Sequence, residues 1–542
     1  MVRDVQQLTA RTYDVLVVGG GIYGLAIARD AALRGLSVAL IERDDFGGGN
    51  SFNHARTIHG GLRYLQTLDI TRSRESVAER RALARMAPHA LKLLPFAVPL
   101  RRSVTKGRLA MRAGFLLDRV VARERNDGVA PSLKLPAGRV LSRSEAIDRF
   151  PGMRRQGLTG AALFYDYVTV EADRLTLSWA LSAAAAGAVL ANYVEAVAPI
   201  REQQRVTGVR ARDVRSGADL SIAARLTVNA TAAGIEGLLA PLGLSTGVPL
   251  LKALNLVTSR EAGEEAIAAR ASSGRNLFLV PWRGRALFGT WESAQPCSPG
   301  DSNVTAAEVG AFLAELNDAF PGLDLTPADV TLVHRGLVPA ARTPHGVALE
   351  KHEQIRDHAA AGMEGIVSVA GTKYTTARAV AERVTDLIMA KLQKPPARCR
   401  TMDPLPGGAI DDPVAAIGRA RAEYDALLPS DALPHLIAAY GSEFTNIAEL
   451  AGERREWSAR VSDTSPVIGA QLVWAVRHEM ALTLADAVVR RTPLGALGYP
   501  GDAAVGTAAA IVGQELAWSD EERRAEVGAL RRFYGTLNAW NT

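Results

Sequence analysis

Cysteine is scarce in this sequence. Only Cys297 and Cys399 occur among 542 residues, and they do not form a C-x-x-C spacing. A disulfide framework or a zinc cluster needs more thiols than this, so the sequence predicts neither, and it indicates no other metal site. Two isolated thiols suit a reducing compartment, and residues 1–10 lack the apolar core of a signal peptide, so we expect a cytoplasmic location.

Long apolar segments are also lacking. The one uncharged run of suitable length, 175–194, consists largely of alanine, and Gly187 divides it into a predicted helix and a following strand. We therefore expect no helix that crosses a bilayer. With 48% hydrophobic and 22% charged residues the composition is that of a folded globular chain, and its length is enough for two or three domains.

Positive charge is in small excess, with a net charge of +6 and a pI near 9.4. Residues 101–125 carry an equal excess, because eight basic residues outnumber Asp118 and Glu124: Arg101, Arg102, Lys106, Arg108, Arg112, Arg119, Arg123 and Arg125. Apolar residues lie among them at helical spacing. This basic segment is either a solvated helix that covers the core or an interfacial helix on anionic lipid. No nucleic-acid partner is predicted, because no binding motif accompanies the charge.

The sequence is organised around a strand, a glycine-rich turn, a helix and a second strand. Tyr13–Val18 is a valine-rich run typical of a buried parallel strand. Ile22–Leu33 has helical spacing and ends before Gly35, and Ser37–Ile41 predicts the second strand. This order predicts a Rossmann-like βαβ unit.

Three glycines in the turn give this unit its chemistry. Gly19 permits the tight turn, Gly21 lets a pyrophosphate approach the backbone, and Gly24 lets helix and strand pack closely. The helix N-terminus then presents free N–H groups to the phosphates. Glu42, at the end of the second strand, can accept hydrogen bonds from a ribose diol. Together these residues predict dinucleotide binding.

A second group of unusual residues follows the βαβ unit. After a glycine-rich turn at 47–51 comes the segment 58–65, with the sequence IHGGLRYL. Its paired glycines let the backbone approach a flat ligand, and Arg63 and Tyr64 can hold an anionic or hydroxylated one. The alternative is a plain turn with a solvated arginine.

A second strand, turn and helix lies near residue 370. Ile366–Ala370 predicts a buried strand, and Ala377–Leu392 predicts a helix whose N-terminus faces the turn that contains Lys373. Such a turn can stabilise negative charge on a flavin or a substrate oxygen. The alternative is an ordinary helix cap by Thr375 or Thr376.

The remaining chain is predicted to form a second sheet and a helical end. The charged helix over 70–86 is predicted to be a surface helix without a functional role. The other elements are a hairpin over 206–226, antiparallel strands at 251–259, 276–281 and 286–290, a helix over 306–320 and a strand over 330–338. Residues 395–408 predict a linker, and the chain beyond it is mostly helical.

Several motifs resemble the FAD-dependent, quinone-linked glycerol-3-phosphate dehydrogenases. They include IHGGLRYL, Ala87-Pro88-His89, Val280-Pro281-Trp282, the turn 371–376, LPGGAI at 405–410, and 478–492. The resemblance implies an α/β fold with an FAD-binding Rossmann-like domain, a mixed-sheet substrate domain and a C-terminal all-helical domain. We expect the first two in 1–400 and the third in 401–542. FAD-binding segments at about 10–75, 155–250 and 360–395 would alternate with substrate-domain segments at 76–154 and 250–360.

The resemblance also implies a set of site residues. FAD would contact Gly19, Gly21, Gly24, Glu42, Arg43, Asn50, Ser51, Gly60, Gly371, Thr372 and Lys373. Substrate and catalytic positions would be His59, Arg63, Tyr64, Asn255, Lys373 and Thr375. In such a site a hydride passes from a secondary alcohol carbon to flavin N5 while a base removes the hydroxyl proton.

Two departures from the family pattern lie on the substrate side. The family's Lys-Gly-Ser-His reads Lys252-Ala253-Leu254-Asn255, so a histidine has become Asn255, which cannot act as a base near neutral pH. The family's Gly-Val-Arg-Pro reads Gly336-Leu337-Val338-Pro339, so an arginine expected to grip phosphate has become Val338. Another family arginine falls near Lys351, and Arg335 or Arg342 could compensate from nearby.

These observations leave three functions open. The first is oxidation of glycerol 3-phosphate to dihydroxyacetone phosphate with quinone as electron acceptor. The second is the same flavin chemistry on another polyol, sugar or amino substrate, because of Val338 and Asn255. The third is a non-catalytic, membrane-associated flavin-binding module. Peripheral contact of residues 101–125 with the inner face of the cell membrane is a separate hypothesis, and whether the chain forms a homodimer is left open.

Overall fold

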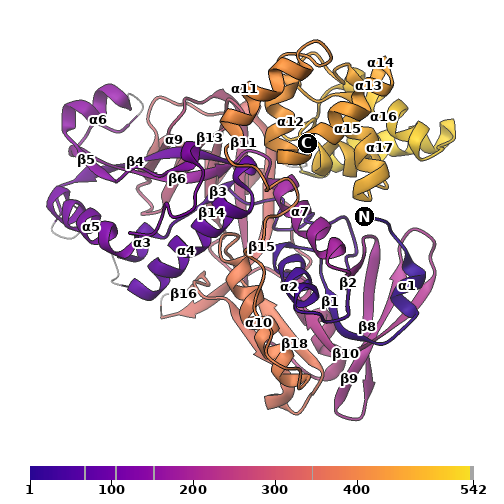
Figure 1. Cartoon of the computed structure of the whole chain (residues 1–542). Coiled ribbons are helices and arrows are strands. Elements are labelled where there is room, and N and C mark those ends of the chain that lie inside the picture. The colour runs from indigo at the N-terminus through magenta and orange to yellow at the C-terminus, as the bar shows by residue number, and fades with distance from the viewer. Residues whose placement is uncertain (66–68, 104–106, 151–152, 345, 538–542) are drawn as a thin grey trace.

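The computed structural model describes residues 1–65, 69–103, 107–150, 153–344 and 346–537, without the side chains of Arg63, Leu65, Thr536 and Leu537. Within these ranges the chain forms two β-sheets, each with helices packed on it, and a C-terminal group of helices (Figure 1). This is the predicted fold class. The C-terminal helices lie at the upper right of Figure 1, beside the N-terminus.

The first sheet contains the predicted βαβ unit and has eight strands in the described part of the chain. Its main path is β17-β18-β10-β1-β2-β7, and the pairs among β18, β10, β1, β2 and β7 are parallel. The strands are β1 (Tyr13–Val18), β2 (Val38–Ile41), β7 (Val189–Ala191), β8 (Val194–Glu202), β9 (Arg205–Asp213), β10 (Asp219–Asn229), β17 (Gln354–Asp357) and β18 (Ile366–Ala370). The predicted hairpin is β9–β10, and β10 continues into the parallel sheet.

Alternate residues of β1 enter two different cores. Val15 and Val17 belong to the core under α2 (Ile22–Leu33), α7 (Ala172–Ala185) and α10 (Ala377–Lys391). Leu16 and Val18 belong to the core on the other face, which α1 (Val5–Thr9) and the β8–β9 layer cover (Figure 1). Since neighbouring side chains of a strand point to opposite faces, a strand buried on both faces is apolar throughout, as the sequence predicts.

The second sheet has ten strands among the described residues, in the order β16-β15-β11-β14-β13-β12-β4-β6-β3, with β5 beside β6. The strands are β3 (Thr57–Ile58), β4 (Leu91–Arg101), β5 (Arg139–Leu141), β6 (Leu158–Thr169), β11 (Leu250–Glu261), β12 (Ala266–Arg270), β13 (Asn276–Trp282), β14 (Arg285–Glu292), β15 (Val330–Thr343) and β16 (Gly346–Leu349). The β11, β13 and β14 pairings are antiparallel, as predicted.

The register of β11 and β15 fixes which side chains share a face. Leu254 and Leu256 pack against α9 (Ala306–Ala319). Asn255 pairs with His334, and the register runs without a shift from Leu250 to Val257. Because side chains alternate, Asn255, His334 and Val338 lie on the face away from α9.

Three strands belong to a different sheet from the one that the predicted domain segments suggest. Strands β3 and β6 lie within segments assigned to the FAD-binding domain, yet they pair in the second sheet. Strand β17 lies in a segment assigned to the substrate domain, yet it pairs with β18 of the first sheet. Strands β3 and β6 are joined to the second sheet by partners far away in the sequence, which local patterns do not encode, whereas β17 pairs with the next strand of the chain. The domain boundaries themselves stay a prediction.

The helix over 70–86 has the predicted bounds but not the predicted exposure. It is α4 (Ile70–Met86), and Arg72, Glu79 and Arg80 on it are buried. Its charged sequence suggested a surface helix, and that prediction was wrong because these side chains have partners on other elements. The helices α3 (Leu62–Leu65) and α5 (Arg108–Val121) contact α4. Helix α6 (Arg143–Arg149) packs on β6, and α8 (Ile235–Leu239) packs near β8.

The C-terminal part is helical, as predicted. Its helices are α11 (Pro413–Tyr424), α12 (Ala432–Tyr440), α13 (Phe444–Glu453), α14 (Arg455–Ser458), α15 (Gly469–Glu479), a π-helix (Asp486–Arg491), α16 (Asp502–Glu515) and α17 (Asp520–Leu537). None of the helices in the described ranges is both long and apolar enough to cross a membrane. The uncharged run 175–194 divides at Gly187 into α7 and β7, as expected.

Candidate active site

The glycine turn between β1 and α2 has the geometry that a phosphate-binding turn requires. Gly19 has a φ of +108°, and a Cβ there would lie 2.6 Å from the carbonyl oxygen of Ala230. A Cβ on Gly24 would lie 1.9 Å from the carbonyl oxygen of Gly19, so only glycine lets α2 pack on β1. At Gly21 the nearest atom is Ser51 Oγ at 3.5 Å. The space beside Gly21 is therefore open at the helix N-terminus, where a pyrophosphate fits.

Glu42 closes this turn from the end of β2. Its Oε2 accepts a hydrogen bond from the Gly20 N–H at 2.7 Å, and its Oε1 accepts one from the Asp44 N–H at 2.9 Å. Burial raises the pKa of Glu42. Each carboxylate oxygen keeps a lone pair for a ribose diol. Arg43 is not part of this group, since its side chain is 71% exposed beside Asp44.

The loop after the turn joins both sheets. Ser51 Oγ accepts a hydrogen bond at 2.9 Å from the Ile22 N–H at the start of α2. On the other side Asn50 Nδ2 donates to the carbonyl oxygen of Leu337 on β15 at 2.7 Å. The predicted contacts Asn50 and Ser51 thus lie between the α2 N-terminus and the second sheet, where a flavin ring attached to a pyrophosphate at Gly21 would extend.

His59 is held by a carboxylate that the sequence analysis missed. His59 Nδ1 lies 3.2 Å from Asp166 Oδ2, and Nε2 lies 2.8 Å from Thr57 Oγ1. Asp166 is 2% exposed and also accepts hydrogen bonds from the Gly60 N–H at 2.8 Å and from Arg80. Burial alone would raise the pKa of Asp166, but Arg80 and His59 outweigh it, so the pKa falls below its usual value and the carboxyl stays ionised.

This arrangement assigns the two ring nitrogens different roles. An ionised Asp166 accepts a proton-bearing Nδ1, so Nε2 of the neutral imidazole carries the lone pair. The His59 side chain is 52% exposed, which leaves it accessible to a ligand. In a histidine oriented in this way, Nε2 is the ring atom that can accept a proton. No local signal identified Asp166, because β6 meets β3 only in the folded sheet.

Lys373 and Tyr64 meet beside the N-terminus of α2. Tyr23, in the first turn of α2, donates its hydroxyl to the Lys373 carbonyl oxygen at 2.9 Å. The Lys373 ammonium lies over the Tyr64 ring, 4.2 Å from its centroid. The predicted turn residues are therefore brought next to the predicted IHGGLRYL segment, although the side chain of Arg63 lies outside the described part of the chain.

The other turn residues are placed as follows. Gly371 approaches Tyr23 so closely that a Cβ would lie 2.3 Å from the tyrosine hydroxyl. Thr372 Oγ1 donates to the carbonyl oxygen of Glu350 at 3.0 Å, and Thr375 is buried. Thr376 is the N-cap residue of α10, but its side chain makes no cap hydrogen bond. The alternative of an ordinary side-chain cap is thus not supported.

Asn255 serves a structural purpose. It is 3% exposed, its Nδ2 donates to the Asn53 carbonyl oxygen at 2.8 Å, and its Oδ1 accepts from Thr290 Oγ1 at 3.0 Å. Both ends of the amide are therefore used to join the 50–56 loop to β11 and β14. Arg335 cannot replace the family arginine at Val338, because it lies three residues away on the α9 face of β15.

A second buried cluster was also missed. Arg56 is fully buried, lies over the Trp282 ring at 4.8 Å, and approaches Asp173 at 3.4 Å and His334 Nε2 at 3.5 Å. Burial, and then the charge of Arg56, hold the pKa of His334 well below its usual value. The pKa of His54 is lowered in the same way. These imidazoles are neutral at physiological pH, next to a permanent cation.

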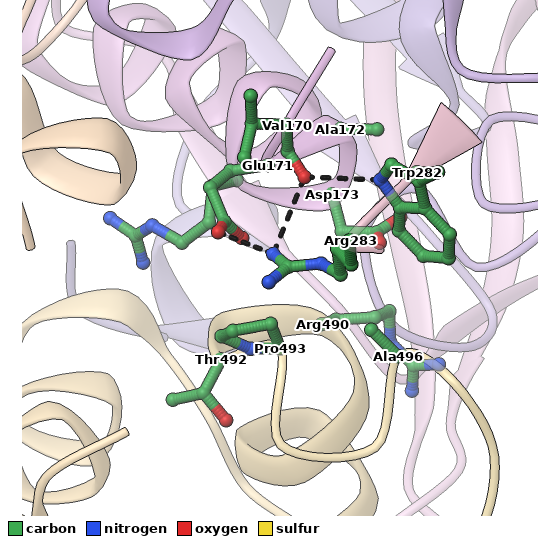
Figure 2. A pocket seen from close by; sticks show the side chains of 11 residues that line it. Val170, Glu171, Ala172, Asp173, Trp282, Arg283, Arg490, Thr492, Pro493 and Ala496 are labelled. Carbon is green, nitrogen blue, oxygen red and sulfur yellow. Dashed lines mark hydrogen bonds and ion pairs between the residues drawn. The ribbon is translucent and has the colours of Figure 1, made fainter. Parts of the chain in front are cut away.

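Buried ion pairs attach the C-terminal helices to this region. Asp45, three residues after Glu42, lies 2.8 Å from Arg491, and both are fully buried. Figure 2 shows a pocket at the same junction, where Arg283 donates to the Val170 carbonyl oxygen and to Glu171. Its walls come from the start of α7, the β13–β14 turn and the segment 490–496. The arginines there are paired with carboxylates, so this pocket is a domain junction.

Comparison with known proteins gives matches over most of the chain. Residues 14–387 match the family described as FAD dependent oxidoreductase, and residues 399–523 match the C-terminal domain of alpha-glycerophosphate oxidase. Glycerol-3-phosphate dehydrogenase of Synechocystis sp. is 31% identical over 512 residues, covering 91% of this chain and 90% of the relative. The glycerol-3-phosphate dehydrogenase of Mycobacterium leprae is 32% identical over 527 residues, covering 95% of this chain and 87% of the relative.

Solved structures agree in fold. The X-ray structure of glycerol-3-phosphate dehydrogenase from Bacillus halodurans complexed with FAD matches with a TM-score of 0.77 and 24% identity, covering 99% of this chain and 97% of that one. Glycine oxidase from Geobacillus kaustophilus matches with a TM-score of 0.53 and 21% identity, covering 73% of this chain and 98% of that one. These likenesses concern the fold alone.

Proposed function

This chain belongs to the FAD dependent oxidoreductase family, with the C-terminal domain of alpha-glycerophosphate oxidase, and from that premise we propose that it oxidises glycerol 3-phosphate to dihydroxyacetone phosphate. It is an FAD-dependent enzyme that resembles the glycerol-3-phosphate dehydrogenases over nearly its whole length. The observation that carries the substrate proposal is the contact of Lys373 with Tyr64 beside the N-terminus of α2, in the same IHGGLRYL segment as the half-exposed His59.

The residues of the first sheet fit FAD. The open space at Gly21 and the α2 N-terminus would hold the pyrophosphate, and Glu42 would hold the ribose diol. Asn50, Ser51, Gly371 and Lys373 would surround the flavin end. When bound, FAD supplies a hydride acceptor for the C–H bond of the substrate alcohol.

His59 is proposed as the base for the hydroxyl proton. As the C–H bond gives up its hydride, the hydroxyl proton passes to Nε2 of His59. In this structure that nitrogen is hydrogen-bonded to the hydroxyl of Thr57. Asp166 keeps the other nitrogen protonated and stabilises the imidazolium that results. In this proposal the base is His59, directly after β3, and not Asn255, whose amide is used elsewhere.

Lys373 and Tyr64 are proposed to orient the substrate. The ammonium can donate to a developing ketone oxygen or an anionic group, and the ring beneath it excludes water from one side. The named relatives support glycerol 3-phosphate over the other polyols, sugars or amino compounds, and over the non-catalytic module, that the sequence left open.

An anaerobic flavin-reduction assay tests the function. Glycerol 3-phosphate added to the FAD-loaded enzyme without oxygen should bleach the oxidised flavin, and glycerol without the phosphate should do so far less. Turnover with a quinone analogue then identifies the acceptor. No bleaching by glycerol 3-phosphate in a fully loaded sample would remove the proposal.

The basic segment is proposed to lie on an anionic membrane, where quinone dissolves. On α5, Met111 and Phe115 are buried, but Leu109, Leu116 and Val120 are 79%, 61% and 70% exposed. Their spacing puts them on one face of the helix, and Arg112 and Arg119 are exposed beside them. Figure 1 shows α5 at the edge of the molecule, away from the C-terminal helices.

Vesicle sedimentation tests the membrane contact. The protein should bind vesicles that contain an anionic lipid, and Leu109→Gln with Leu116→Gln should abolish most of that binding. Val414→Gln, at a residue 64% exposed on the C-terminal part, serves as the control. Equal binding by both variants would refute the contact.

A further inference from the structure

Arg72 is a buried cation without a carboxylate partner in the described part of the chain. It lies in the first turn of α4 and is 7% exposed. No Asp or Glu side chain of the described residues lies within ion-pair distance of its guanidinium, and the residues outside these ranges include no Asp or Glu. Because a buried charge is normally paired, such a site indicates a missing anion.

The contacts that Arg72 does make direct it toward the predicted site. Its guanidinium lies 5.3 Å from the centroid of the Tyr64 ring, the same ring that Lys373 approaches at 4.2 Å. One amino group donates to Nδ1 of His352, which lies just before β17. Two cations therefore lie against one tyrosine of the IHGGLRYL segment, and an imidazole contacts one of these cations.

The neighbouring carboxylates are engaged elsewhere. Glu75, one turn along α4, pairs with Arg383 at 2.7 Å, and Glu353 also pairs with Arg383. Glu350 accepts the N–H groups of Lys351 and His352 at 2.8 and 3.0 Å. These contacts tie α4, α10 and the segment 350–353 into one junction, and they leave the positive charge of Arg72 for a ligand.

We propose that Arg72, together with Lys373 and His352, forms the anion-binding end of the substrate site. It would take the role that the resemblance gives to an arginine at the position of Val338. The ligand would be a small hydroxylated compound with a phosphate or carboxylate group, because a planar guanidinium binds either group through two hydrogen bonds. This inference rests on the proposed function for its location at the substrate.

Binding of inorganic phosphate to the FAD-loaded protein tests the site without turnover. Arg72→Met, measured by calorimetry, should weaken phosphate binding about 10- to 100-fold, the usual effect of losing a charge-assisted contact. Phosphate binding by Arg72→Lys should be intermediate between that of the parent and that of Arg72→Met, because lysine keeps the charge without the planar arrangement of donors. Arg74→Met is the matched control on the exposed face of α4 and should change binding less than about twofold.

Thermal melting provides a second readout. Phosphate should raise the Tm of the parent protein and of Arg74→Met but not that of Arg72→Met, since only a bound ligand stabilises the folded state. Replacing the buried cation with an apolar side chain of similar length should leave the variant folded. Acetate in place of phosphate decides the ligand class: binding of acetate alone that depends on Arg72 would support the site and assign a carboxylate substrate.

The outcomes separate this inference from the proposed function. If glycerol 3-phosphate reduces the flavin but phosphate binds equally to the parent and to Arg72→Met, the anion site is refuted and the function stands. If Arg72→Met loses phosphate binding while glycerol 3-phosphate fails to reduce the flavin, the anion site is supported and the function is refuted.

Discussion

Asp166 Oδ2 lies 3.2 Å from Nδ1 of His59, although the two residues are 107 positions apart. The pair forms where β3 meets β6, and Asp166 also accepts the Gly60 N–H. One carboxylate thus fixes both the imidazole and the start of the paired glycines. The orientation of the His59 ring and the shape of the IHGGLRYL turn therefore depend on the same group.

Asp166→Asn should lower kcat about 10²- to 10⁴-fold, the range of a lost general base, because an amide no longer fixes the proton on Nδ1. His59→Gln should have a similar effect, and the double variant should be no worse than His59→Gln, since the residues act as a unit. Steady-state kinetics measure both. The exposed Asp148→Asn is the control. Additive losses in the double variant would contradict the pairing.

The parts of the fold that local sequence determines were predicted closely. The bounds of β1, α2, α4 and β18 agree with the valine runs, glycines and caps that specify them. Each of these signals acts within a few residues, so no tertiary knowledge is needed.

The missed features depend on contacts distant in sequence. Arg72 lies on a helix that was predicted to be a surface helix, and Arg56 had no predicted role. Their partners His352 and His334 lie 280 and 278 positions away. The exposure of a charged residue on a helix is decided by what packs on that helix, which periodicity does not reveal. Asn255 was a departure from a family motif, and only its two hydrogen bonds show what the new residue does.

Gly21→Ala should separate folding from cofactor binding. The added methyl would lie 3.5 Å from Ser51 Oγ, an ordinary contact, so the apoprotein should keep its Tm. The methyl would occupy the space for the pyrophosphate, and the Kd for FAD should rise at least about tenfold. A fluorescence titration of the apoprotein with FAD measures this.

Gly310→Ala is the matched control for that variant. Nothing lies within 4 Å of a Cβ there, and the residue is in the middle of α9. The change should stabilise the protein by about 0.5–1 kcal/mol and leave FAD binding unchanged. If Gly21→Ala binds FAD as tightly as Gly310→Ala does, the pyrophosphate does not lie at this turn.

Glu171 should make the domain junction sensitive to acid. Burial would raise its pKa, but Arg283 and His435 lower the pKa to about 2. A pKa below the unfolded value of 4.5 means that the stabilisation is complete above about pH 5 and is lost as the pH falls from there to about 2. A pKa shift of this size corresponds to about 3 kcal/mol of unfolding free energy.

Glu171→Gln tests this dependence. The variant should lose about 3 kcal/mol of unfolding free energy at neutral pH, and its difference from the parent should shrink as the pH falls below about 4.5. Urea unfolding at a series of pH values measures the difference. Glu521→Gln, at an exposed position, should follow the parent throughout. A difference that is independent of pH would show that Glu171 acts by packing alone.

Asn255→His restores the residue that the family motif has at this position, and it should not restore activity. The amide donates to the Asn53 carbonyl oxygen and accepts from Thr290, and the backbone of β14 leaves no room for a larger group, because a Cβ on Gly289 would lie 2.0 Å from Asn255 Oδ1. The imidazole should therefore break the attachment of the 50–56 loop and destabilise the protein by about 1–3 kcal/mol.

Loss of the Asn255 hydrogen bonds should also weaken FAD binding, because Asn50 and Ser51 belong to the loop that Asn255 anchors. Thermal melting and an FAD titration measure the two effects, and Asn303→His, at an exposed position, should show neither. A gain in kcat without a fall in Tm would mean that this position still faces the substrate as a base. In that case His59 and Asp166 would have to be reassigned from proton transfer to shaping the turn around Gly60 and Gly61.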